Sequence, residues 1–111
     1  MSGISAGGGL TYINQPWDGS SLRLGYINAT SNYTIKQTDF FIDCTGGSFT
    51  VSLPTAAAIS GKQFSIKNSG TGAITIDANG SETIDGMLNF ILSTQYEAIL
   101  VASDGANWKV I

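Results

Sequence analysis

The run Gly61-Lys62-Gln63-Phe64-Ser65-Ile66-Lys67-Asn68 decides the fold class of this chain of 111 residues. Phe64 and Ile66 fall on one face of an extended segment and alternate with polar residues, which is the pattern of a strand buried on one side. The alternation returns in Ala73-Ile74-Thr75-Ile76, in Glu82-Thr83-Ile84-Asp85-Gly86 and in the closing segment Ser103–Ile111. That last segment runs to the final residue, and a terminus used as a strand is tied into a sheet.

Similar segments lie on both sides of this run. Alternating apolar residues predict strands around three further sets: Phe49, Val51 and Leu53; Leu88, Phe90 and Leu92; Trp108 and Val110. The run Ala98–Ala102 is apolar at every position, which predicts a strand buried on both faces. The one helix-like piece, Thr55–Ser60, lies between Pro54 and Gly61 and is too short for more than a turn or two.

Turn-forming residues separate these segments at intervals of about 8 to 12 residues, a spacing typical of antiparallel β proteins. They are Thr45-Gly46-Gly47, Asn68-Ser69-Gly70-Thr71-Gly72, Asn79-Gly80, Asp85-Gly86 and Asp104-Gly105. Asn-Gly and Asp-Gly favour hairpins because both residues tolerate a positive φ. The expected fold is therefore all-β, a small antiparallel β-sandwich or barrel-like domain.

The chain has the length of one domain, and its two ends differ in character. Residues 1–30 are more polar and richer in loop signals, so we interpret them as an entry segment or connector. Residues 31–111 are expected to form the compact β domain. No internal repeat stands out at this level.

Composition restricts the classes of function. Only 12% of residues are charged, about half the usual share, which suggests either a surface hidden in an oligomer or one rich in Ser, Thr and Asn. The net charge is −3 and the basic residues are scattered, so nucleic acid is not an expected partner. No run approaches the ~20 apolar residues of a membrane helix, and no signal peptide is visible. Cys44 is the only cysteine, and we expect a buried, inert thiol.

The residues that carry most enzyme chemistry are missing or poorly placed. The chain has no histidine, which removes the commonest general base and most transition-metal sites. Asp39 and Asp43 could share a strand face, and paired carboxylates hydrolyse glycosides, but turn-forming or solvent-facing acids are the simpler interpretation. We therefore expect no enzymatic activity, no cofactor and no metal site.

The order of segments from Tyr33 to Ile111 resembles the C-terminal tip domain of trimeric bacteriophage tail fibres and tailspikes, and of related phage-like trimeric bacterial adhesins. The resemblance rests on five motifs in this order: Thr50-Val51-Ser52-Leu53-Pro54, Gly61–Asn68, Ile74-Thr75-Ile76, Glu82–Gly86 and Ser103–Ile111. It implies a homotrimer, intertwined or side by side, at the tip of a virion tail fibre or of a bacterial surface fibre. The single cysteine, which allows no intrachain disulfide, favours synthesis in a reducing cytoplasm. The resemblance also implies attachment to a cell-surface glycan or protein receptor, without insertion into a membrane.

Two functions are compatible with this resemblance: a tip that binds a receptor, and a trimerisation or folding cap that binds nothing. Sugar rings stack on aromatic side chains while carboxylates and amides bind their hydroxyls, so exposed aromatic residues beside Asp or Asn would favour the first. Trp17 with Asp18, and Asn107 with Trp108, are the candidate ligand-binding residues, and Tyr12, Tyr26 and Tyr96 are secondary candidates. Core packing competes as an interpretation of Trp108, because it shares its strand face with Val110. Packing against a neighbouring subunit competes as an interpretation of Trp17.

Overall fold

The computed structural model describes residues 22–111 and contains only strands, turns and loops in that range, which confirms the all-β class. The nine strands are β1 (Tyr26–Ala29), β2 (Tyr33–Thr34), β3 (Phe41–Cys44), β4 (Phe49–Ser52), β5 (Gln63–Asn68), β6 (Ile74–Asp77), β7 (Asn89–Leu92), β8 (Ala98–Ser103) and β9 (Trp108–Val110). They form a five-stranded sheet in the order β1-β3-β5-β8-β9 and a four-stranded sheet in the order β2-β4-β6-β7. The sheets face each other across one apolar core.

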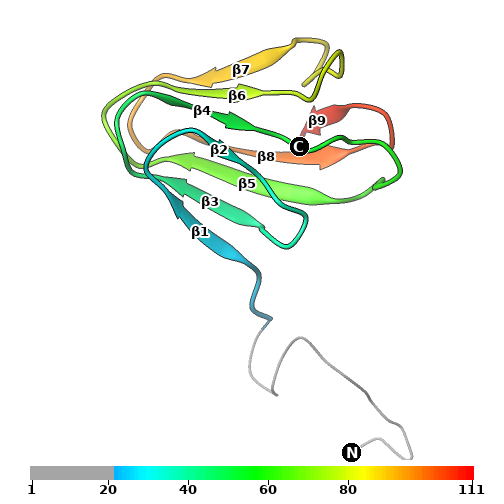
Figure 1. The fold of residues 1–111 in the computed structure, drawn as a ribbon, viewed down its shortest axis with the longest axis horizontal. Coiled ribbons are helices and arrows are strands. Elements are labelled where there is room, and N and C mark those ends of the chain that lie inside the picture. The colour runs from blue at the N-terminus through cyan, green and yellow to red at the C-terminus, as the bar shows by residue number, and fades with distance from the viewer. Residues whose placement is uncertain (1–21) are drawn as a thin grey trace, which may run out of the picture.

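The first six strands wind alternately between the two sheets (Figure 1). Each pair, β1 with β2, β3 with β4 and β5 with β6, makes one coil, and each coil stacks on the one before it. Neighbouring strands of successive coils are therefore parallel, with Tyr26 opposite Phe41 and Phe41 opposite Ser65. In the other sheet Tyr33 lies opposite Val51, and Val51 lies opposite Ile76.

This winding corrects the expectation of an antiparallel sandwich, because both sheets are mixed. The glycine-rich turns after β3 and β5 do not close hairpins. They are arches that carry the chain from one sheet to the other, so a strand pairs with the strand after next. Only the last three strands pair antiparallel: β7 with β6, β8 with β5, and β9 with β8. Asp104-Gly105 does turn β8 into β9, with Gly105 at a φ of 96°.

The inner faces of most strands supply the core as the alternation predicted, although Leu88, expected on one face with Phe90 and Leu92, is exposed just before β7. Phe64 and Ile66 on β5 and Ile74 and Ile76 on β6 are fully buried, and they come from opposite sheets. Val51 and Leu53 are buried as well, with Phe49 packed partly buried against the core. The strand β8 differs from its prediction, because its outward side chains are exposed at Ala98 and only half-buried at Leu100 and Ala102.

Buried Asn68 joins the wound strands to the closing strands. Its amide nitrogen donates to the carbonyl oxygen of Gly72 at 2.8 Å and to that of Leu92 at 3.0 Å. Its side-chain oxygen accepts from the backbone N–H of Gly70. Its backbone N–H donates to Glu97, and its backbone oxygen accepts from Tyr96. One side chain at the end of β5 is thus tied to the arch into β6 and to the end of β7.

The compact unit begins earlier than residue 31. Tyr26–Ala29, placed by sequence in the entry segment, forms β1 and pairs along its whole length with β3. The two strands also share a pattern of aromatic, Ile, Asn or Asp, and small residue: Tyr26-Ile27-Asn28-Ala29 and Phe41-Ile42-Asp43-Cys44. The first two coils therefore place side chains of the same kind one above the other.

The arches stack by close backbone contact, which only glycine permits at three positions. A Cβ at Gly46 would collide with the carbonyl oxygen of Thr30, one at Gly70 with that of Gly46, and one at Gly72 with the backbone N–H of Ser48. Each collision is with the arch of the coil below. A Cβ at the adjacent Gly47 would point into open space, and the φ of Gly47 is not positive.

We predict that Gly46→Ala destabilises the fold by roughly 1–3 kcal/mol, because the new methyl group forces two backbone segments apart. The matched variant Gly47→Ala should change stability by less than about 1 kcal/mol, in either direction. Chemical denaturation of both variants measures the difference. Equal stability of the two variants would contradict the stacking of the arches.

Candidate functional site

The sequence candidates fall into two groups. Trp17 and Asp18 lie outside the described residues, so their ligand-binding role stays a prediction. Asn107 and Trp108 lie in the turn before β9 and at its first position, and both are well defined by their contacts. The structure therefore describes only the second pair, Asn107 and Trp108.

Trp108 belongs to the core, so its assignment as a ligand-binding residue is wrong. Its exposed fraction is 0%, and its ring lies 5.6 Å from that of Phe64, centroid to centroid. The indole Nε1 donates to the carbonyl oxygen of Pro54 at 3.2 Å. The strand parity that pairs Trp108 with Val110 points both side chains inward, which leaves no ring surface for a sugar.

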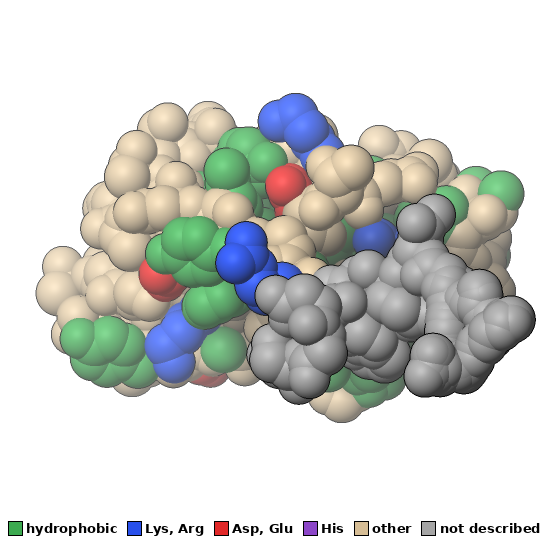
Figure 2. Space-filling view, turned by 90° about the horizontal axis from the view of Figure 1, so that it is seen from below, with side chains coloured by type: hydrophobic (Ala, Val, Ile, Leu, Met, Phe, Trp, Pro, Cys, Tyr) green, Lys and Arg blue, Asp and Glu red, His purple; other side chains and the backbone are tan. Residues whose placement is uncertain are grey.

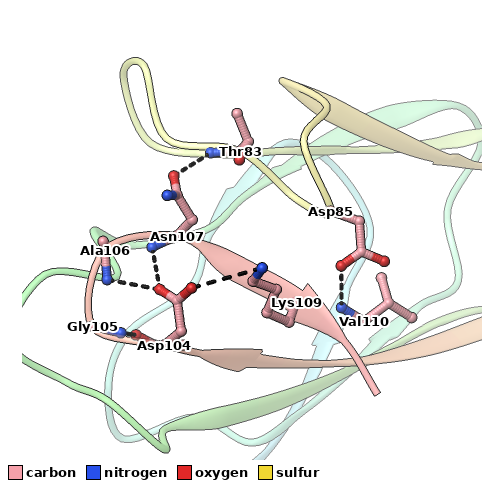
Figure 3. Close-up of polar contacts among 9 residues, drawn as sticks. Thr83, Asp85, Asp104, Gly105, Ala106, Asn107, Lys109 and Val110 are labelled. Carbon is pink, nitrogen blue, oxygen red and sulfur yellow. Dashed lines mark hydrogen bonds and ion pairs between the residues drawn. The ribbon is translucent and has the colours of Figure 1, made fainter.

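Asn107 is engaged in holding the turn together (Figure 3). Its side-chain oxygen accepts the backbone N–H of Thr83 at 3.0 Å, and its own backbone N–H donates to Asp104 Oδ1 at 2.7 Å. The same Asp104 oxygen accepts the N–H of Ala106. On the other side of β9, Asp85 Oδ1 accepts the N–H of Val110 at 3.1 Å. The motif Ser103-Asp104-Gly105-Ala106-Asn107 thus fastens β9 to the loop before β7.

The two aspartates considered as a catalytic pair each bind a tyrosine instead. Asp39 precedes β3 and accepts from the Tyr33 hydroxyl at 2.6 Å, a hydrogen bond that raises the pKa of Tyr33 to about 12. Asp43, on β3, accepts from the Tyr26 hydroxyl at 2.8 Å and from the Ser69 hydroxyl. The bond to Asp43 raises the pKa of the Tyr26 phenol, so that this group stays a neutral donor. Cys44 is buried as expected, and burial raises the pKa of its thiol to about 12.

Exposed aromatic rings and polar groups do meet on the outer face of the five-stranded sheet. The cross-strand register sets Asn28, Asp43 and Lys67 side by side in one row. Tyr26 lies on one side of this row and is 57% exposed, and Tyr96 lies at its far end and is 63% exposed. We call these five residues the Tyr26–Tyr96 surface.

The position of Tyr96 is fixed by its backbone and by Lys67. Tyr96 adopts a φ of 71°, a left-handed conformation that is uncommon for a bulky side chain. The Lys67 ammonium donates to the Tyr96 carbonyl oxygen at 3.2 Å and lies 5.6 Å from the centre of its ring. The ring is thus held at the surface beside a cation, and Asp43 lies opposite that lysine on the neighbouring strand. Neutral sugars use such a combination, with a ring to stack on and charged groups for their hydroxyls.

An apolar area adjoins the Tyr26–Tyr96 surface. A shallow depression of about 370 Å³ is lined by Leu22, Leu24, Tyr26, Phe40, Phe41 and Ser65. Tyr26 and Phe41 pack edge to face there, 5.2 Å apart between ring centres. Further across the sheet, Ser65 lies opposite Leu100, and Leu100 is bonded through its backbone to Ile111. Tyr26, Phe41, Leu100 and Ile111 thus lie in one row, with Ser65 between Phe41 and Leu100, and we call these four residues the outer apolar row.

The outer face of the four-stranded sheet has a different character. Its outward residues are mainly hydroxyl, carboxyl and amide side chains, in the cross-strand rows Thr34, Ser52, Asp77, Asn89 and Thr50, Thr75, Ile91. Figure 2 shows the molecule from below, where single basic and acidic side chains and small apolar areas lie among other side chains and backbone.

Sequence reasoning found Tyr26 and Tyr96 but missed Asn28 and Lys67 as their neighbours. Asn28, Asp43 and Lys67 are far apart in the chain, and the parallel pairing of β1, β3 and β5 brings them into one row. Within residues 22–111 there is no cluster of three or more potential metal ligands, and no helix long and apolar enough to cross a membrane. No protein-family model matches the chain, and no curated protein matches its sequence.

We predict that Asp104→Ala lowers the free energy of unfolding at pH 7, because the turn before β9 loses its acceptor. Hydrogen bonds from Asn107 and Ala106 lower the pKa of Asp104 below its ordinary value of 3.8. The stabilisation is therefore complete above pH 3.8 and is lost as the pH falls through the lower pKa of the folded state.

Urea titrations of wild type and variant at pH 7 and pH 2 measure this effect. Asp104→Asn serves as the control, since it keeps an oxygen acceptor and should lose less stability at pH 7. A stability difference of the same size at both pH values would refute the role given to the carboxylate.

Proposed function

We propose that this domain is a non-enzymatic, homotrimeric fibre tip that attaches to a cell-surface glycan. Its setting is the tip of a virion tail fibre or of a bacterial surface fibre. The observation that carries the proposal is that the outer face of the five-stranded sheet has an apolar part and, next to it, a part with exposed tyrosine rings and charged groups. The outer apolar row suits contact with other copies, and the Tyr26–Tyr96 surface at its border suits a sugar. The motifs from Tyr33 to Ile111 that resemble fibre tips support the same function.

The outer apolar row supports self-association on physical grounds. Tyr26 and Ile111 are each more than half exposed, and they lie in one line with Phe41 and Leu100. Apolar side chains that gather in one place on a surface mark interaction sites more often than scattered ones do. Three copies packed by this face would cover the row, Tyr26 included, and would place the remaining residues of three Tyr26–Tyr96 surfaces around one axis. Such multivalent display raises avidity for weak sugar contacts by about 10²–10⁴.

A structural cap without a ligand is the second candidate function. It is favoured by the motif Ser103–Asn107, whose polar groups are used inside the fold rather than offered to a partner. The cap would use the same trimer contacts, and no ligand would bind to the Tyr26–Tyr96 surface. The two functions therefore differ in binding and not in assembly.

The assembly is tested by the mass of the protein in solution. Light scattering at micromolar concentration should give three times the 11.6 kDa of one chain. Leu100→Glu should dissociate the trimer, because it places a charge within the outer apolar row. Thr75→Glu introduces the same charge on the outer face of the other sheet and should leave the mass unchanged. A monomeric wild-type protein would rule out the proposed assembly.

The ligand is tested on a glycan array, with wild type, Tyr96→Ala and Trp17→Ala side by side. Both variants should lose at least about tenfold in saccharide binding, as expected when an aromatic contact is removed. Their trimer mass and melting temperature should persist. Ile91→Ala, which removes an exposed side chain from the four-stranded sheet, is the control and should bind as wild type does.

Two results would favour the structural cap instead. One is that the wild-type domain binds no glycan and no cell surface. The other is that Trp17→Ala weakens the trimer while binding per trimer is unchanged, which would place Trp17 at a subunit contact.

A further inference from the structure

Lys67 is the basic residue of the Tyr26–Tyr96 surface, and no carboxylate among residues 22–111 forms an ion pair with it. The ion pair in that part of the chain joins Lys109 to Asp104, at the turn between β8 and β9. The Lys67 ammonium donates instead to the Tyr96 carbonyl oxygen at 3.2 Å and lies 5.6 Å from the centre of the ring. An ammonium group has three N–H donors, so this contact leaves others for a ligand.

The carboxylate that faces Lys67 on the neighbouring strand is already bonded to other groups. Asp43 lies opposite Lys67 in the register of β3 and β5. Its Oδ1 accepts the hydroxyl of Ser69, and its Oδ2 accepts the hydroxyl of Tyr26 at 2.8 Å. The acceptor oxygens of Asp43 are therefore used within the protein.

Other acceptors around this surface are used in the same way. The side-chain oxygen of Asn28 accepts the Thr45 hydroxyl at 2.6 Å. Oε1 of Glu97, the residue after Tyr96, accepts the N–H groups of Ser93 and Thr94. What this surface still offers among residues 22–111 is mainly donors, namely the ammonium group and the amide nitrogen of Asn28. A ligand that supplies acceptors suits it best.

The side of Lys67 that faces away from Asp43 has room for a ligand. The register places Ala98 of β8 opposite Lys67 on that side, and Ala98 is exposed. Its methyl group is short, so the space above it lies next to both the ammonium and the Tyr96 loop. A negative group bound there would have Lys67 between itself and the Asp43 carboxylate.

The backbone of Tyr96 provides an observation that does not depend on charge. Its φ of 71° is a left-handed conformation that is unfavourable for a bulky side chain and that glycine adopts freely. The side chain is 63% exposed, so burial in the core does not compensate for this strain. Strained residues of this kind concentrate at ligand sites. The exposed ring is thus held in place although another residue would fit the backbone better.

We infer that the Tyr26–Tyr96 surface binds an acidic saccharide, with a carboxylate or phosphate group at Lys67 and the sugar ring against Tyr96. This inference rests on the proposed function and names the class of sugar. An anionic group supplies the acceptors that the surface lacks, and its hydrogen bonds to an ammonium are roughly twice as strong as those between neutral groups. The hydroxyl groups of a neutral sugar meet fewer free acceptors here.

Paired glycans on an array, probed with the full chain, test the inference. Glucuronic acid and glucose differ by a carboxylate in place of a hydroxymethyl group, and a phosphorylated glucose carries a phosphate at the same carbon. The wild type should bind the acidic forms at least about tenfold more tightly than glucose, as expected for a hydrogen bond to a charged group. This preference should fall in about 0.5 M salt, because exposed charges are screened.

The array separates failure of this inference from failure of the proposed function. Equal binding of acidic and neutral glycans would overturn the acidic preference and leave glycan attachment in place. Absence of binding to any glycan or cell surface would remove both. Comparison of the glucuronic acid and phosphorylated forms shows which anionic group Lys67 prefers, and tighter binding of either one than of glucose supports the inference.

A matched pair of lysine variants tests the role of Lys67. Lys67→Gln should abolish the preference for acidic glycans, whereas Lys67→Arg should keep it. Lys36→Gln is the control, because Lys36 also lies over a tyrosine ring, 5.1 Å from the centre of Tyr33, but follows β2 of the other sheet. It should bind as the wild type does. A preference that survives Lys67→Gln would overturn the inference.

Variants at Ala98 test the position of the anionic group without removing the lysine. Ala98→Glu and Ala98→Gln add side chains of similar size, and only the first adds a negative charge. Acidic glycans should bind Ala98→Glu at least about tenfold more weakly than Ala98→Gln, because the new carboxylate competes for Lys67. Equal binding by the two variants would contradict the placement beside Ala98.

Tyr96→Gly tests whether the ring is kept for a ligand. Glycine adopts the left-handed backbone without strain, so the melting temperature should stay the same or rise. Glycan binding should fall at least about tenfold, because the aromatic contact is lost. A variant that melts at a lower temperature and binds as tightly as the wild type would assign the ring to the fold and overturn its place in the site.

Discussion

The fold depends on the join between the parallel strands β1 to β6 and the antiparallel strands β7 to β9, and Asn68 at the end of β5 holds that join in place. Its side chain is fully buried and bonded to the backbone of Gly70, Gly72 and Leu92. A buried amide with its hydrogen bonds satisfied favours one arrangement strongly, since any shift leaves a polar group unpaired at a cost of about 1–3 kcal/mol. The arch into β6 and the end of β7 are therefore fixed together. This positions β8, and with it Tyr96 beside Lys67.

The sequence predicted the strands and the core, but not how the strands are connected in space. Alternation identifies an inner face wherever one side of a strand is buried, so Phe64, Ile66, Ile74 and Ile76 were recognised. Turn residues are less informative, because a glycine-rich turn suits a hairpin and an arch between sheets equally well. The close contact that requires Gly46 involves Thr30 of the previous coil, a neighbour that no local pattern reveals. The two-sided burial predicted for β8 was wrong for the isolated chain, whose outward residues there are half-buried or exposed.

The candidate site was harder to predict, for a related reason. Asp or Asn next to an aromatic residue is a sequence pattern typical of a sugar-binding site. The same pattern is typical of a turn in which these side chains accept backbone N–H groups. Around Trp108 the structure selects the turn, because Asp104 and Asn107 accept backbone N–H groups and the ring is in the core. The Tyr26–Tyr96 surface is made of residues from several strands, and its existence depends on a register that parallel stacking sets. Knowing which residues are exposed would not have identified this surface, because the register decides which exposed residues are neighbours.

The outer surface is built by the same winding as the core. Each coil places an aromatic or small residue in one outward row and an amide, carboxylate or ammonium group in the next, as Tyr26 with Asn28, Phe41 with Asp43 and Ser65 with Lys67 show. The residues between them, Ile27, Ile42 and Ile66, lie in one row on the inner face and belong to the core or pack against it. Because inner and outer residues alternate along the same strand, a shift of one residue in register would disrupt both rows together. The register that forms the core therefore also decides which side chains a partner can meet on the outer face.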